Sequence, residues 1–204
     1  MFVSDTIAAV ASGMTVSGIG IIRISGPDSF HIIKDIFKNK AGKPFEELKS
    51  HKVYYGFIFD AETLLDEVLV IPMKAPRSYT MEDTIEIDCH GGNLILSNIL
   101  KLIVRKGARI AEPGEFTKRA FLNGRIDLTQ AESVMDLIES KTEQTRKVAI
   151  KGLNGNVSNM IRNLRQEILE ELLAPIEVNI DYPEYEDIEI AYKDKIINVV
   201  DELI

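Results

Sequence analysis

The chain has 204 residues, of which 45% are hydrophobic and 27% are charged, and its formal net charge is −8. This composition is typical of a globular protein with one large or two small domains, and typical domain sizes favour two. The negative charge excludes a general affinity for nucleic acids, because phosphate binding requires clustered lysines and arginines. The single cysteine, Cys89, suits a reducing compartment. No stretch approaches the roughly 20 apolar residues of a membrane span and no signal peptide is recognisable, so we expect a cytoplasmic protein.

The N-terminal part of the chain has the pattern of strands with one helix between them. Residues 6–11 and 21–26 are short apolar runs that predict strands, and Arg23 in the second run can face either solvent or a ligand. Asp28 or Ser29 can cap a helix to about Phe37, which a polar loop follows to about Ser50. Residues 53–59 and 64–73 then predict a β-hairpin with a turn at residues 60–63.

The stretch from Pro76 to Gly92 concentrates the polar side chains that could carry chemistry. Residues 84–89 alternate, which places Ile85 and Ile87 on one face of a predicted strand and Glu86 on the other. Glycines then precede a helix predicted over residues 94–104. A helix start of this kind offers backbone N–H groups to an anion or a polar ring, so we expect the functional site here.

The residue pattern favours some kinds of chemistry over others for this stretch. Cys89 and His90 are adjacent on the predicted strand and point to opposite faces, which favours a buried cysteine over a nucleophile and its base. His90, Asp88 and Glu82 are too loosely spaced to predict a metal site. Glu86 could accept paired hydrogen bonds from a planar ring rich in N–H groups, while arginines elsewhere hold the carboxylates of the ligand. In the alternative interpretation, Glu86 is simply the exposed side of an edge strand.

An all-helical part begins where the composition changes, around Asn123-Gly124. Before it, residues 108–111 predict a short strand and residues 115–122 a helix. Thr129 with Glu132 matches a capping box at the head of one long helix through about Leu153. A turn at residues 154–156 leads to a second helix, and we expect the two helices to pack as an antiparallel pair. The second helix carries one apolar stripe, which consists of Val157, Ile161, Leu164, Ile168 and Leu172.

The last part of the chain has an acidic segment followed by an apolar helical pattern. Residues 177–192 contain no Lys or Arg, and we interpret their acidic side chains as solvated surface. Residues 196–204 have the pattern of a helix that stops while still apolar, so we expect the native protein to continue further. The acidic residues are Glu177, Asp181, Glu184, Glu186, Asp187 and Glu189.

Several ordered sequence blocks resemble the MnmE family of tRNA modification GTPases, also called TrmE. The blocks are residues 20–26 (GIIRISG), 78–83 (SYTMED), 89–92 (CHGG), 113–124 (PGEFTKRAFLNG) and 127–132 (DLTQAE). Together they extend the resemblance over essentially the whole chain. The resemblance implies an α+β fold, in which residues 1–119 form a mixed sheet with helices similar to the folate-binding domain of aminomethyltransferases. Residues 120–204 would be the first part of a helical domain, truncated before an inserted Ras-like GTPase domain.

The resemblance also implies a function. Members of the family bind a tetrahydrofolate one-carbon donor, 5-formyl- or 5,10-methylene-tetrahydrofolate, in the N-terminal domain and form a homodimer through it. They join the flavoprotein MnmG in a heterotetramer that installs an aminomethyl-type group, such as carboxymethylaminomethyl, on the wobble uridine of certain tRNAs. The folate-site positions of the family fall on Arg23, Glu86 and Arg125. Glu86 would pair with the pterin N–H edge, and the two arginines would engage the pterin surroundings or the glutamate tail.

The sequence also departs from the family pattern. Arg125 stands where lysine is common, and Met81 stands where glycine is usual, so we expect the turn before Glu82 to differ. No catalytic or metal-binding residue of the family falls within this chain, because GTP, magnesium and potassium belong to the GTPase domain. We therefore expect these residues not to hydrolyse GTP. Two other interpretations are a stand-alone folate-dependent one-carbon transferase and a non-catalytic dimerisation module.

Overall fold

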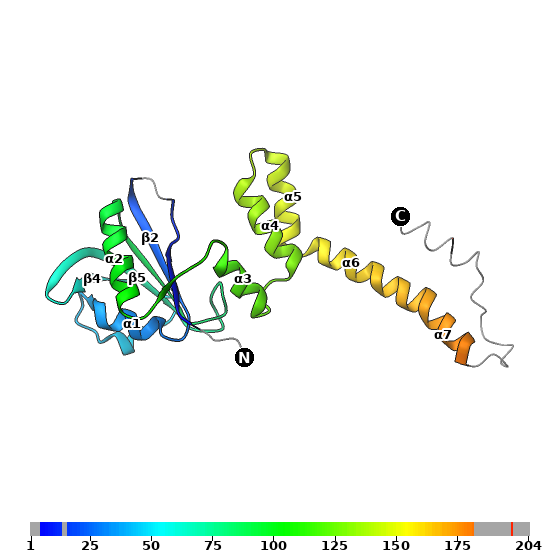
Figure 1. The fold of residues 1–204 in the computed structure, drawn as a ribbon, viewed down its shortest axis with the longest axis horizontal. Coiled ribbons are helices and arrows are strands. Elements are labelled where there is room, and N and C mark those ends of the chain that lie inside the picture. The colour runs from blue at the N-terminus through cyan, green and yellow to red at the C-terminus, as the bar shows by residue number, and fades with distance from the viewer. Residues whose placement is uncertain (1–4, 14–15, 182–196, 198–204) are drawn as a thin grey trace. The chain divides into compact units, whose positions relative to one another are not determined.

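The structure, a computed structural model, describes residues 5–13, 16–181 and 197, and the chain divides into two compact units (Figure 1). The first unit, Met1–Ile126, contains a mixed sheet with helices, and the second, Asp127–Ile204, is helical where it is described. This confirms the predicted α+β class with a following all-helical segment. The units divide after Ile126, close to the composition change around Asn123-Gly124, whereas the resemblance placed the boundary after residue 119.

In the described part of the first unit, seven strands form a mixed sheet with the order β3-β4-β5-β6-β2-β1-β7. Neighbouring strands are antiparallel, except that β1 and β7 are parallel. The predicted hairpin is confirmed as β4 and β5, whose turn is made by Ala61 and Glu62. The strands are β1 (Ile7–Val10), β2 (Ser17–Ser25), β3 (Phe37–Asn39), β4 (Tyr54–Asp60), β5 (Thr63–Met73), β6 (Thr84–Gly91) and β7 (Arg109–Ile110).

Two helices, α1 (Ser29–Ile36) and α2 (Asn93–Arg105), cover one face of the sheet (Figure 1). Their apolar sides pack on the inward residues of β2 and β6, which removes a large apolar surface from water and stabilises the unit. Leu94, near the start of α2, is 74% exposed, so the buried side of this helix begins at Leu96. The fully buried side chains include Ile22, Ile24, Ile32, Ile33, Ile36, Ile85, Ile87, Leu96, Ile99 and Leu102.

The opposite face of the sheet carries polar and partly exposed side chains. Strand alternation buries Ile85 and Ile87 under the helices and places Glu86 on the other face, as the sequence predicted. Arg23 lies on that face of β2, between the buried residues Ile22 and Ile24. The sheet therefore presents a polar surface on the side away from its core.

Shorter elements complete the first unit. The 3-10 helix η1 (Phe45–Glu47) lies in the predicted polar loop, and β3, which the sequence did not predict, lies just before it. The helix α3 (Glu115–Leu122) has the predicted bounds. Gly114, which precedes it, has a φ of 74°, a conformation that suits glycine because it has no Cβ.

The predicted long helix over residues 129–153 is wrong, because the chain breaks after α4 (Leu128–Glu139) and restarts at α5 (Glu143–Leu153). Ser140 is extended, and Thr142 caps α5 by accepting a hydrogen bond from the backbone N–H of Thr145 at 3.1 Å. The capping box of α4 is also different from the predicted one. Asp127 accepts from the backbone N–H of Gln130, whose side chain accepts from the backbone N–H of Asp127.

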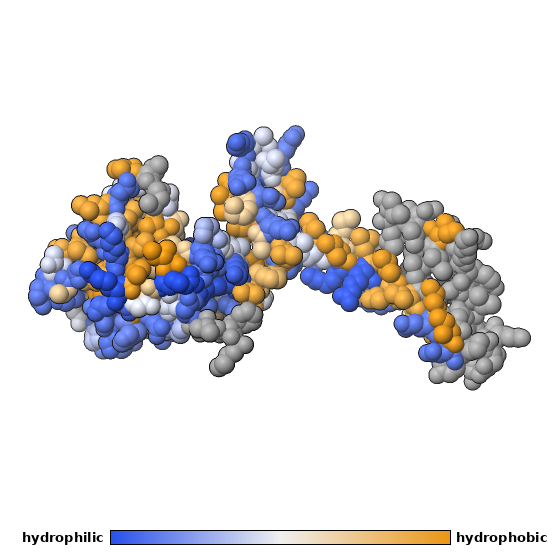
Figure 2. All heavy atoms as spheres, in the orientation of Figure 1, coloured by the Kyte–Doolittle hydropathy of each residue, from blue (hydrophilic) through white to orange (hydrophobic). Residues whose placement is uncertain are grey.

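The packing predicted for the helical part is wrong for the same reason. The helix α5 packs against α4, and the approach is so close that a Cβ on Gly152 would lie 2.1 Å from Ser133 Oγ. The next helix, α6 (Asn156–Glu167), continues through the π-helix η2 (Ile168–Leu173) into α7 (Ala174–Asp181). Among the described residues nothing covers the apolar stripe of α6, since Val157 is 44% exposed and Ile161 is 52% exposed, and apolar side chains are visible along it in Figure 2.

Some sequence predictions fall beyond the residues that the structure describes. Glu177 and Asp181 of the acidic segment lie exposed on α7, as predicted. The remaining acidic residues and the helix predicted over 196–204, apart from residue 197, lie outside the described residues. None of the described helices has both the length and the apolar composition needed to cross a membrane.

Candidate functional site

The predicted site residues Arg23 and Glu86 form an ion pair on the polar face of the sheet. They occupy directly opposed positions on the antiparallel strands β2 and β6. Glu86 Oε1 accepts hydrogen bonds from Arg23 Nε at 2.8 Å and from Arg23 Nη2 at 2.6 Å. The two side chains are 27% and 22% exposed, so the pair is partly buried and remains open to a ligand.

Tyr79 connects this pair to the third predicted residue, Arg125. The Arg23 guanidinium lies 5.7 Å from the centroid of the Tyr79 ring, and the Arg125 guanidinium lies 4.7 Å from it. Arg125 also donates a hydrogen bond to the Tyr79 carbonyl oxygen at 3.2 Å. The Tyr79 hydroxyl lies 3.0 Å from Thr117 Oγ1, which fixes the ring against α3. We call Arg23, Tyr79, Glu86 and Arg125 the β2–β6 site.

The β2–β6 site can bind a ligand that carries both N–H donors and anionic groups. Among the described residues, Glu86 Oε2 has no protein partner and can accept a hydrogen bond. Next to it on the same face, burial raises the pKa of Asp88, and the negative charge of Glu86 raises it further. Arg23 and Arg125 supply positive charge, and the Tyr79 ring supplies an aromatic surface.

An open pocket of about 540 Å³ adjoins the β2–β6 site and shares Tyr79 and Arg125 with it. It lies beside the loop that joins β5 to β6. We call it the Arg77 pocket, and its lining residues are His51, Met73, Pro76, Arg77, Ser78, Tyr79, Met81 and Arg125.

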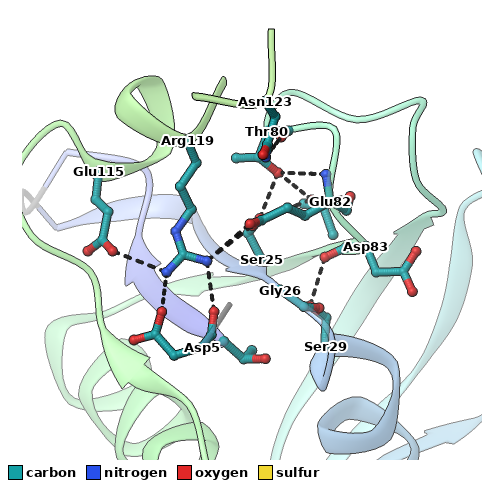
Figure 3. Close-up of polar contacts among 12 residues, drawn as sticks. Asp5, Ser25, Gly26, Ser29, Thr80, Glu82, Asp83, Glu115, Arg119 and Asn123 are labelled. Carbon is teal, nitrogen blue, oxygen red and sulfur yellow. Dashed lines mark hydrogen bonds and ion pairs between the residues drawn. The ribbon is translucent and has the colours of Figure 1, made fainter. Parts of the chain in front are cut away.

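Arg119 of α3 anchors the surroundings of the site through three carboxylates (Figure 3). It contacts Asp5 at 2.5 Å, Glu82 at 3.2 Å and Glu115 at 3.2 Å, and only 11% of its side chain is exposed. The pKa of Glu115 is lowered to about 2, mainly by the hydrogen bonds that Arg109 donates to its carboxylate. The N-terminal segment, the loop before β6 and α3 are therefore held together by the ion pairs of one largely buried arginine.

A hydrogen-bond network joins the loop before β6 to β2 and to the end of α3 (Figure 3). Ser25 donates to Glu82 at 2.7 Å and lies 2.7 Å from Thr80 Oγ1. The side-chain amide of Asn123 donates to the Thr80 carbonyl oxygen at 2.7 Å. Met81 has a φ of 59°, so this methionine adopts the left-handed conformation that favours glycine.

Cys89 and His90 do not act as a pair. Cys89 is buried, donates to the Gly20 carbonyl oxygen, and has its pKa raised by burial to about 11. The His90 ring instead lies against Asp66, with Nδ1 at 2.7 Å from Oδ1, and this hydrogen bond raises its pKa. The prediction of a buried cysteine is confirmed.

Sequence reasoning did not find the contacts of Tyr79 or the anchoring role of Arg119. The spacing of Glu115 and Arg119, four residues apart on a helix, is the signal that predicts one of the three ion pairs. The contacts of Tyr79 depend on where the β5–β6 loop folds back, which no periodicity encodes. Among the described residues, no group of His, Cys, Asp and Glu side chains could hold a metal ion.

The fold and the charged cluster together define a class of protein: an α+β unit with a group of charged side chains on the open face of its sheet, followed by a helical unit. Residues 6–125 match the family model described as GTP-binding protein TrmE N-terminus, and residues 128–204 match the MnmE helical domain. The chain belongs to this family.

Curated relatives support the same assignment. The chain is similar to the tRNA modification GTPase MnmE of Lactococcus lactis subsp. cremoris (strain MG1363), at 55% identity over 185 residues. It is 54% identical over 189 residues to that of Streptococcus pneumoniae (strain Hungary19A-6) and 52% identical over 187 residues to that of Bacillus subtilis (strain 168). These alignments cover 91% to 92% of this chain and 40% of each relative, so the chain spans less than half the length of the relatives it matches.

Proposed function

We propose that this chain is the folate-binding and dimerising part of a tRNA modification GTPase. The observation that supports the site assignment is the clustering of Arg23, Glu86 and Arg125 around Tyr79. These three charged residues are distant in the sequence, yet two of them form an ion pair and both arginines lie against one aromatic ring. Such a cluster offers hydrogen-bond acceptors, donors and a stacking surface within one open site.

The chemistry of this cluster suits a tetrahydrofolate such as the 5-formyl or 5,10-methylene form. The pterin edge presents amino and ring N–H groups. These groups would donate hydrogen bonds to Glu86 Oε2 and, after the ion pair with Arg23 rearranges, to Glu86 Oε1. Arg23 and Arg125 would then face the rest of the folate, whose glutamate tail is anionic at neutral pH. No residue of this chain is assigned a catalytic role.

The activity of the whole protein extends the proposal beyond these residues. The relatives are named as tRNA modification GTPases, and we infer that GTP hydrolysis, with magnesium and potassium, takes place in a domain outside this chain. With the flavoprotein MnmG in a heterotetramer, the protein would install the carboxymethylaminomethyl-type group on wobble uridines in the cytoplasm. The net charge of −8 supports a principal tRNA surface elsewhere in that assembly.

Exposed apolar side chains on the open sheet face support homodimerisation through the first unit. Tyr55 and Leu69 are paired neighbours on β4 and β5 and are 36% and 40% exposed, and Ile19 on β2 is 64% exposed. Exposed apolar groups of this kind commonly mark interfaces. In a light-scattering experiment we expect the chain to have the mass of a dimer and Leu69→Lys to shift it toward the monomer. A wild-type monomer at all concentrations would contradict this part of the proposal.

Calorimetric titration of the chain with 5-formyltetrahydrofolate tests the folate assignment. We expect saturable binding that Glu86→Ala weakens by about tenfold to a hundredfold, the loss typical of a hydrogen bond to a charged group. Glu62→Gln, in the exposed β4–β5 turn, is the matched control and should bind like the wild type. A dimer without folate affinity would favour a pure dimerisation module, and turnover of methylene-tetrahydrofolate by this chain alone would favour a one-carbon transferase.

A further inference from the structure

The Arg77 pocket is a positively charged pocket in an otherwise acidic chain. Its lining includes the guanidinium groups of Arg77 and Arg125 and the imidazole of His51, and no carboxylate. The chain as a whole has 32 acidic and 24 basic residues, so a pocket without an acidic residue departs from the general surface. A concentration of guanidinium groups in a pocket is suited to carboxylate or phosphate ligands.

The arginines of this pocket differ from the others in the first unit. Within the described residues of that unit, Arg77 and Arg125 are the arginines that have no carboxylate partner. The remaining ones, Arg23, Arg105, Arg109 and Arg119, each form at least one ion pair. The two unpaired guanidinium groups are therefore available to an external anion.

The loop that carries Arg77 is held in place by its own hydrogen bonds. The backbone N–H of Arg77 donates to the Lys74 carbonyl oxygen at 3.1 Å, and Ser78 Oγ donates to the Glu82 carbonyl oxygen at 2.6 Å. At the start of the loop, the backbone N–H of Ala75 donates to Asp83 Oδ1 at 2.9 Å. A fixed loop lowers the entropy cost of placing the Arg77 side chain against a ligand.

The Arg77 pocket shares two residues with the β2–β6 site. Tyr79 and Arg125 line the pocket, and the same two residues contact each other in the site beside Arg23. A ligand whose N–H-rich end lies at Glu86 would therefore direct its other end past Tyr79 toward Arg77. The shared residues suit one elongated ligand with an anionic end.

We propose that the Arg77 pocket binds the γ-linked oligoglutamate tail of the folate, so that the protein selects folates with several glutamates over the monoglutamate form. This inference rests on the proposed folate function of the β2–β6 site. Each additional γ-linked glutamate adds one carboxylate, and Arg77 and Arg125 offer planar donor pairs that match carboxylates. Arg77 is thus a specificity residue that acts on the tail, at a distance from the pterin.

The test compares two probes, 5-formyltetrahydrofolate with one glutamate and the same compound with five, titrated into the 204-residue chain. Each exposed ion pair contributes only modestly to the free energy of binding. We therefore expect the pentaglutamate to bind the wild type about tenfold more tightly than the monoglutamate. Arg77→Gln should remove most of this preference, because it weakens pentaglutamate binding more than monoglutamate binding. Lys101→Gln removes one exposed positive charge from α2, on the other face of the sheet, and should keep the wild-type preference.

The outcomes separate this inference from the proposed function. Equal affinity of the wild type for both probes, or an unchanged preference in Arg77→Gln, would overturn the tail subsite while leaving folate binding intact. Failure of both probes to bind the wild type would overturn the folate function itself. The preference should also decrease as salt is raised, since exposed charges are screened. A preference that is independent of salt would contradict an ionic tail contact.

Discussion

Arg23 Nη2 lies 2.6 Å from Glu86 Oε1, across two neighbouring strands and on the face of the sheet that the helices α1 and α2 leave open. The pair orients the carboxylate before any ligand arrives, and its second oxygen remains available. A binding site prepared in this way loses less entropy when the ligand binds.

Removal of Arg23 tests whether this orientation matters for binding. In Arg23→Gln we expect folate affinity to decrease by about tenfold, because the Glu86 carboxylate loses its fixed partner. The stability should decrease by only about 1 kcal/mol or less, because the ion pair is partly exposed. Titration and urea unfolding measure the two effects, and an unchanged affinity would contradict the orienting role.

Tyr79 is expected to position both arginines through its ring. Tyr79→Phe keeps the ring against Arg23 and Arg125 and loses the contact with Thr117, so folate affinity should remain within about threefold of the wild type. Tyr79→Ala removes the ring, and affinity should decrease by about tenfold. Equal losses in both variants would show that the hydroxyl, and not the ring, positions the site.

Arg119 is expected to be the most important charged residue for the stability of the first unit. Its removal in Arg119→Ala leaves Asp5, Glu82 and Glu115 without a shared partner, and we expect a loss of about 3 to 5 kcal/mol in the free energy of unfolding. Arg146→Ala, which breaks an exposed pair with Glu143, should cost about 0.5 kcal/mol or less. Urea unfolding measures both, and similar losses would contradict the anchoring role of Arg119.

Because of Glu115, the stability of the first unit is expected to decrease at acidic pH. Hydrogen bonds from Arg109 hold the pKa of Glu115 at about 2 in the folded protein, below its ordinary value of 4.5. A lowered folded pKa stabilises the protein above about pH 4.5, and this contribution is lost as the pH falls toward about 2. Urea midpoints measured over this range should fall less steeply in Glu115→Gln, and identical slopes would contradict this account.

Cys89 should be unreactive in the folded protein. It is 4% exposed, and burial raises the pKa of its thiol to about 11, so almost no thiolate is present at neutral pH. We expect iodoacetamide to label it slowly in the native chain and rapidly in urea. Rapid labelling of the native chain would show that the thiol is accessible.

Strand alternation and β-branched runs were sufficient to predict most of the first unit. The inward positions of Ile85 and Ile87 and the outward position of Glu86 follow from the period of two in a strand. The strand β3 could not be predicted, because Phe37, Lys38 and Asn39 carry no alternating pattern and form a strand only by pairing with β4. Long-range pairing of this kind is a property of the fold and not of the local sequence.

The helical part was harder to predict, because its capping signals compete. Thr129 with Glu132 and Asp127 with Gln130 both match a capping pattern, and the structure uses the second. The break at residues 140–142 depends on Ser140 and Thr142 acting as helix ends, although serine and threonine also occur within helices. The apolar stripe on α6 predicted that another element covers this face of the helix. Among the described residues, no element does so.

Chemical reasoning selected Glu86 as the candidate binding residue, and the resemblance to a family added Arg23 and Arg125. Sequence patterns could not show that all three lie around Tyr79, because their closeness depends on the pairing of β2 with β6 and on the fold of the loop before β6. The Arg77 pocket depends on the same loop.

The most direct measurement of the central claim is a crystal structure of this chain with bound 5-formyltetrahydrofolate. The account predicts the pterin N–H edge within hydrogen-bond distance of the Glu86 carboxylate, with Arg23, Tyr79 and Arg125 in contact with the ligand. A folate bound with its pterin away from Glu86 would contradict the assignment of the β2–β6 site.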